Sequence, residues 1–131
     1  MITSSRLKEL RTESVQASIS IAKSILEQGI DPFVTKEQER AAVADRKGFV
    51  LQVKICGDEK AFYVSGEGGQ NKVEVPRAND RINDALGRAL QTELESALQA
   101  AGFDVINVEM RVMENLQHRP EAINLRISAC F

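Results

Sequence analysis

Hydrophobic and polar positions follow two different periods along this chain, and the change of period shows where helices give way to strands. From residue 5 to residue 28, apolar side chains such as Leu7, Leu10 and Ile25 recur every three or four positions. This spacing predicts an amphipathic helix, which Ser4 or Ser5 would cap. Gly29 and Pro32 follow and predict that the helix ends near residue 28.

A second, shorter helix is predicted over residues 35–46. It would open on TKEQ, residues 35–38, a capping-box pattern in which Thr35 and Gln38 satisfy each other's backbone amides. Its apolar residues, from Ala41 to Ala44, are small, so we expect this helix to lie near the surface.

From Phe49 onward the period becomes two, which is typical of strands with one buried face. The pattern returns to three and four between residues 80 and 101, where Asn79 or Asp80 would cap a helix and Gly102 would end it. We expect strands at residues 49–56, 61–65, 72–75, 106–112 and 123–131, with turns at residues 57–60 and 114–121.

These elements predict an α+β fold with the order α-α-β-β-(β)-α-β-β. Each strand has one apolar and one polar face, so we expect an antiparallel sheet of four or five strands with the helices packed on one face. The length of 131 residues predicts a single domain over residues 1–131.

Composition and charge bear on which partners and which cellular compartment we expect for the protein. The chain carries 17 basic and 19 acidic residues, a net charge of −2, which gives no general attraction to nucleic acid or to a membrane surface. No apolar run reaches the roughly 18 residues that span a bilayer. Two cysteines and a polar N-terminus favour a reduced, cytoplasmic protein.

The stretch GEGGQNK, residues 66–72, has the glycines and the lysine of a phosphate-binding loop. Such a loop cradles phosphate where a helix begins. Here VEVP follows, which alternates like a strand, and Glu67 places a negative charge within the loop. The pattern therefore favours a strand connection in which glycine supplies a positive φ.

The sequence contains few groups suited to catalysis or metal binding. His118 lies in a predicted loop without a neighbouring histidine or cysteine, and Cys56 and Cys130 fall on predicted strands. A zinc site needs three or four ligands and a nucleophile needs an adjacent base, so we expect no metal, no cofactor and no enzymatic activity. The alternative is a small ligand carrier or enzyme that uses the GEGGQNK loop with His118.

The polar face of the sheet is the main candidate for binding a partner protein. Glu109 is expected to pair with Arg111 or Arg126 across the last hairpin. Aromatic residues make up 5% of the chain and Tyr63 is the outward-facing candidate, whereas RNA-binding sheets use aromatic side chains to stack bases. The predicted partner-binding residues are Lys54, Asn107, Glu109, Arg111, Asn124 and Arg126. A nucleic-acid-binding alternative would use Lys54, Arg111, Arg126, Arg77, Arg81 and Arg88.

The first helix offers a second candidate surface. Its apolar arc is wide for a helix that covers one sheet, and part of it would pack against a second copy in a homodimer. The alternative is that the arc contacts both the sheet and the 80–101 helix. The predicted self-association residues are Val15, Ser18, Ile19, Ala22 and Leu26. The predicted function is thus a non-enzymatic, cytoplasmic protein-interaction or assembly module that self-associates.

Overall fold

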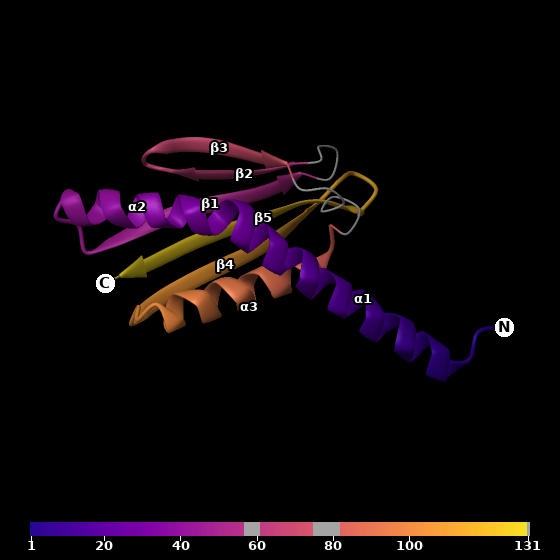
Figure 1. Ribbon diagram of the computed structural model, residues 1–131. Helices are drawn as coiled ribbons and strands as arrows, with labels where there is room; N and C mark the ends of the chain where they lie inside the picture. The colour runs from indigo at the N-terminus through magenta and orange to yellow at the C-terminus, as the bar shows by residue number, and fades with distance from the viewer. Residues whose placement is uncertain (57–60, 75–81, 131) are drawn as a thin grey trace.

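A five-stranded antiparallel sheet with helices on one face forms the fold (Figure 1). The computed structural model describes residues 1–56, 61–74 and 82–130. This architecture confirms the predicted α+β class and element order, with the fifth strand present. In chain order the elements are α1 (Ser4–Ile25), a π-helical turn (Leu26–Ile30), α2 (Asp31–Val43), β1 (Gly48–Cys56), β2 (Ala61–Gly66), β3 (Gly69–Glu74), α3 (Asp84–Ala100), β4 (Val105–Glu114) and β5 (Pro120–Cys130).

The strands lie in the order β3-β2-β1-β5-β4, so β1 is the central strand, with β2 on one side and β5 on the other. Val53 of β1 is opposite Val64 of β2 on one side and Leu125 of β5 on the other. All three side chains are buried. The alternation of buried and exposed positions along β1 therefore places one row of apolar side chains beneath the helices and leaves the other face open.

The helices cover the apolar face in two parts. α3 packs on β4 and β5, α2 packs on β1, and α1 crosses α3. The core between these layers is mostly aliphatic, and the aromatic side chain of Phe62 is the largest of its fully buried side chains. Figure 1 shows that the N-terminal half of α1 extends well beyond the end of the sheet.

Residues 4–43 form one continuous helical segment, although the sequence predicts a break near residue 28. α1 continues through the π-helical turn into α2, where the Asp31 N–H donates to the carbonyl oxygen of Leu26, five residues earlier. Pro32 falls in the first turn of α2, where a residue without an N–H is tolerated. The predicted end near residue 28 and the predicted capping box are therefore both wrong. Thr35 lies inside α2, and its hydroxyl donates to the Asp31 carbonyl at 3.1 Å.

Gly29 is needed for packing and does not end a helix. It is buried in the π-helical turn, and a Cβ built on it would overlap the ring of Phe62 and lie 3.0 Å from Val73 Cγ2. Because the helix continues past this glycine, Phe33 and Val34 belong to α2 and are buried. Within the predicted range, residues 35–46, most positions are exposed as expected, and Glu37 and Ala41 are buried.

Both ends of α3 have defined caps. The side chain of Asn83 accepts the Leu86 N–H at 3.0 Å, so the helix starts at Asp84 and not at residue 80. Asn79 and Asp80, the caps predicted from the sequence, lie outside the described residues. The cap of α1 also differs from the prediction, because Thr3 accepts the Arg6 N–H at 3.2 Å.

Gly102 ends α3 as predicted, with a positive φ of 92°. Its N–H donates to the Gln99 carbonyl and the Phe103 N–H donates to the Leu98 carbonyl, the two bonds of a Schellman motif. The Phe103 ring meets the Phe49 ring edge-on at 5.6 Å between centroids. This contact ties the end of α3 to the first residues of β1.

Candidate functional site

The open face of the sheet, the face turned away from the helices, carries two rows of polar side chains that cross all five strands. The strand register fixes the members of each row. The first row contains Gln70, Ser65, Gln52, Arg126 and Glu109. The second row contains Lys72, Tyr63, Lys54, Asn124 and Arg111.

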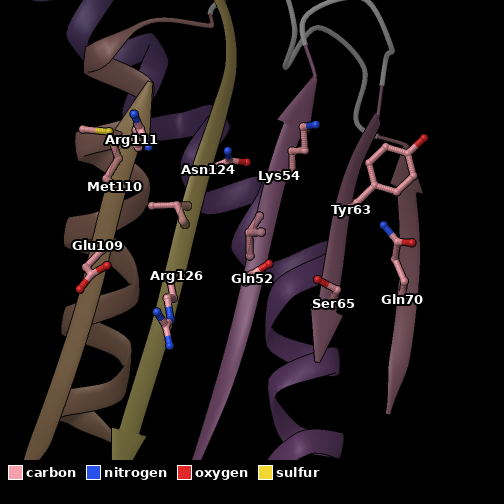
Figure 2. Close-up of a pocket in the computed structure, with 12 residues that line it drawn as sticks. Gln52, Lys54, Tyr63, Ser65, Gln70, Glu109, Met110, Arg111, Asn124 and Arg126 are labelled. Atoms are coloured by element: carbon pink, nitrogen blue, oxygen red, sulfur yellow. The ribbon is translucent and has the colours of Figure 1, made fainter. Parts of the chain in front are cut away.

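These rows enclose a shallow trough of about 710 Å³. Figure 2 shows the side chains of Lys54, Arg111 and Arg126 on the same side of the strands, with the helices behind the sheet. Amide, hydroxyl and cationic groups thus share one concave surface.

The trough is positively charged although the chain as a whole is acidic. Its lining includes three cations, Lys54, Arg111 and Arg126, and one carboxylate, Glu109, while the net charge of the chain is −2. In the part of the chain that the structure describes, Glu109 forms no ion pair with either arginine, although it is opposite Arg126 in register. Its Oε1 instead accepts from Asn107 Nδ2 at 3.1 Å.

Five of the six predicted partner-binding residues line the trough, and Asn107 is exposed beside it. The sequence interpretation did not select Ser65 or Gln70, which join the lining because Gly66 pairs with Gly69 in the β2–β3 hairpin. The signal that would have found them is the position of the hairpin turn, since it fixes which residues of β2 and β3 lie opposite each other.

The cations of the nucleic-acid-binding alternative are not gathered on one surface. Arg88 is exposed on α3, in the helical layer, whereas Lys54, Arg111 and Arg126 lie on the open face. Arg77 and Arg81 lie outside the described residues. Tyr63, the outward-facing aromatic, has Lys72 Nζ 5.9 Å from its ring centroid.

The glycine stretch forms the tight β2–β3 hairpin rather than the start of a helix. Residues 67 and 68 make the turn, and Gly69 has a φ of 123°, which confirms that glycine supplies a positive φ here. The Gly68 N–H donates to Glu37 Oε1 of α2 at 3.1 Å, and Glu67 forms an ion pair with Arg46. A carboxylate of the chain itself therefore occupies the position next to a glycine amide.

Replacing Glu37 with alanine should destabilise the fold, because Glu37 is 5% exposed and fixes the hairpin to α2. Loss of a hydrogen bond to a charged group predicts a decrease of about 1.5 kcal/mol in the free energy of unfolding. Urea denaturation followed by circular dichroism measures it, and Lys36→Ala on the exposed side of α2 is the matched control. Equal stability of the two variants would contradict a stabilising role for the Glu37 contact.

The cysteines and the histidine do not form a shared site. Cys130 is opposite Gly48 at one end of β1, and Cys56 lies at the other end, about 27 Å away at the rise of a strand. His118 is an exposed loop residue, as predicted, with Nδ1 3.6 Å from Glu114 Oε2. Among the described residues, no group of three or more His, Cys, Asp or Glu side chains is placed to hold a metal ion.

The predicted self-association residues occupy three different environments. Ser18 and Ala22 are fully buried in the core, so neither is accessible to a second copy. Ile19 and Leu26 are partly buried, and Val15 is exposed. The arc that appeared wide in the sequence thus packs partly within the chain, where α1 crosses α3, and self-association itself stays a prediction.

Comparison with known proteins found no match to a family model, to a curated protein or to a solved structure. Of the helices in the described ranges, none is both long enough and apolar enough to cross a membrane.

Proposed function

We propose that this protein is a non-enzymatic, cytoplasmic protein-interaction module whose trough on the open face binds an extended, acidic segment of a partner protein. The observation that carries the proposal is the trough between the two cross-strand rows, whose lining includes three cations and one carboxylate. Arginine and lysine bind carboxylates through charge-assisted hydrogen bonds, and the neighbouring amides can bond a peptide backbone.

The dimensions of the rows suit a short peptide. Four gaps between five strands span about 19 Å, the length of about six residues in an extended chain. A peptide that crosses the strands between the two rows would meet Arg126 of β5 and Arg111 of β4 at one end and the amide of Gln70 at the other. This arrangement favours acidic side chains near β5 and β4 and uncharged residues near β3.

A protein partner fits the trough better than a single-stranded nucleic acid. Proteins that bind single strands combine cations with aromatic side chains on which the bases stack. The aromatic residue lining this trough is Tyr63, and Lys72 already lies near its ring.

Charge reversal in the trough tests the proposal. The probe is a fluorescein-labelled eight-residue peptide of alternating Glu and Ser, and binding is followed by fluorescence anisotropy. Arg126→Glu replaces an attractive contact with a repulsive one, so we expect the dissociation constant to rise at least about tenfold. Lys36→Glu makes the same change of charge in the helical layer and should leave binding unchanged.

Two further probes distinguish the alternatives. A peptide of alternating Lys and Ser should not bind, and an eight-nucleotide oligothymidine should bind more weakly than the acidic peptide. Tighter binding of the oligonucleotide, lost in Arg126→Glu, would support the nucleic-acid-binding alternative instead. Equal binding of the acidic peptide to both variants would overturn the assignment of the trough.

A further inference from the structure

Asn124 lies at the centre of the positive part of the trough. Lys54 of β1 is opposite it on one side and Arg111 of β4 is opposite it on the other. Arg126 follows Asn124 by two residues on the same face of β5. Opposite residues have Cβ atoms about 5 Å apart, and residues two apart on one strand are about 7 Å apart. Three cations, which we call the cation cluster, therefore surround one amide side chain.

Within residues 1–56, 61–74 and 82–130, no carboxylate forms an ion pair with the cation cluster. Glu109 is the acidic residue of the trough lining, and its Oε1 accepts from Asn107 Nδ2 at 3.1 Å. Asn107 precedes Glu109 by two residues on the same face of β4, whereas Arg111 follows it by two. This hydrogen bond therefore draws the carboxylate toward the side of Glu109 that is away from Arg111.

The three side chains of the cation cluster are exposed, and they differ in direction. Figure 2 shows Lys54 and Arg111 on either side of Asn124, whereas Arg126 extends toward the opposite end of the strands. Exposed side chains change rotamer within nanoseconds, so Arg126 can turn toward Asn124 when a ligand binds there. Lys54 and Arg111 thus flank the site, and Arg126 completes it.

The amide of Asn124 adds a hydrogen-bond donor at the centre of the cluster. Its Nδ2 donates to the sulfur of Met113 at 2.9 Å. A thioether sulfur is a weak acceptor, so this bond can be exchanged for one to an anionic oxygen at little cost. The cation cluster therefore encloses a donor that a negatively charged ligand can use.

A phosphoryl group suits this arrangement better than a carboxylate does. A phosphomonoester carries a charge of about −1.5 to −2 at neutral pH and three strong acceptor oxygens, whereas a carboxylate carries one charge and two oxygens. Arg111 and Arg126 can each donate two parallel N–H bonds to phosphoryl oxygens, and Lys54 adds a compact charge. The cluster thus offers enough charge and enough donors for one dianion.

We propose that the acidic segment bound in the trough contains a phosphorylated serine or threonine, whose phosphoryl group lies over Asn124 and is bound by the cation cluster. This inference rests on the proposed function, because the phosphoryl group reaches β5 only when the peptide lies in the trough. β5 is next to the edge strand β4, so the phosphorylated residue belongs near one end of the stretch that crosses the sheet.

Fluorescence anisotropy with three labelled peptides tests the inference at one fixed salt concentration. The first is the eight-residue peptide of alternating Glu and Ser, and the second carries phosphoserine as its fourth residue. The third has glutamate in place of the serines at its fourth and sixth positions, so its charge matches that of the second. The phosphopeptide should bind at least about tenfold more tightly than the charge-matched peptide, because it presents one group to all three cations.

Replacing Lys54 and Arg111 together with glutamine should remove this difference. The dissociation constants of the phosphopeptide and the charge-matched peptide should then lie within about twofold of each other. Both positions are exposed, so the circular dichroism spectrum should not change. Lys36→Gln with Arg88→Gln removes the same two charges from the helical layer and is the matched control, which should keep the full difference.

Each remaining outcome has one meaning. Equal binding of the phosphopeptide and the charge-matched peptide to the wild type overturns the phosphoryl site and leaves the proposed function standing. A difference that persists in the Lys54→Gln, Arg111→Gln variant also overturns the site. Binding of the phosphopeptide alone supports the site and contradicts a general preference for acidic segments. Inorganic phosphate that displaces the phosphopeptide as effectively as unlabelled phosphopeptide does would mean that the cluster binds free phosphate, which overturns a phosphorylated partner.

Discussion

Replacing Gly29 with alanine is expected to lower the free energy of unfolding by about 2 kcal/mol, because two opposing effects combine at this position. Alanine is the better helix former, which favours the variant by about 1 kcal/mol. Its Cβ, however, overlaps the ring of Phe62, and overpacking a buried site costs up to about 3 kcal/mol. The ring is fully buried and cannot rotate into solvent, so we expect the overlap to dominate.

Urea denaturation of Gly29→Ala and of a double variant with Phe62→Leu measures this coupling. Leucine lacks the far end of the ring. The double variant should therefore lose less stability than the sum of the losses measured for the two single variants. Gln28→Ala, at an exposed position one residue earlier, is the control and should change stability little. Additive effects in the double variant would mean that the overlap with Phe62 does not cause the loss.

Leu125→Ala is expected to have the largest effect of the substitutions considered, a loss of about 3 kcal/mol in the free energy of unfolding. Leu125 is 1% exposed on β5, which is hydrogen-bonded to β1 on one side and to β4 on the other. Removing its side chain leaves a cavity between the sheet and the helices. Neighbouring strands on both sides restrict the relaxation that would fill this cavity.

Arg126→Ala is the matched control for Leu125→Ala, because the next residue on β5 points to the open face. We expect its stability to lie within about 0.5 kcal/mol of the wild type, as is usual for exposed positions. The same thermal or urea denaturation experiment measures both variants. A loss of similar size in both would contradict the assignment of one buried and one open face.

The sheet was the part of the fold that the sequence predicted best. Period-two patterns around Leu51, Val53 and Leu125 set the buried face of β1 and β5, because a shift by one residue would expose every apolar side chain. The polar residues between them, including Lys54 and Arg126, were assigned to the open face for the same reason. The structure confirms these side-chain directions.

The helical layer was predicted less well, because its boundaries depend on contacts between distant residues. Gly29 and Pro32 are ordinary signs of a helix end. Here Gly29 allows close contact with Phe62, more than 30 residues away, and the π-helical turn brings Pro32 into the first turn of α2. The start of α3 was placed too early, since a single side chain, that of Asn83, sets it.

The sequence predicted which side chains lie on the open face of the sheet. It did not predict which of them together line the trough. Alternation alone identifies which side chains point outward from a strand. It does not say which residues of neighbouring strands lie opposite each other, so Gln70 was not selected with Arg126. The burial of Ser18 and Ala22 was missed for a similar reason, because only the crossing of α1 and α3 shows which part of the apolar arc is covered.

The π-helical turn also sets the rotation of α1 about its own axis. It contains one residue more than an α-helical turn, since Asp31 reaches back five positions to Leu26. Removing that residue would restore an α-helical turn and rotate everything before it by about 100° relative to α2. Ser18 and Ala22 would then turn away from α3, and Ala17 and Ile21 would take their places at the crossing. The π-helical turn thus determines which face of α1 packs against the rest of the fold.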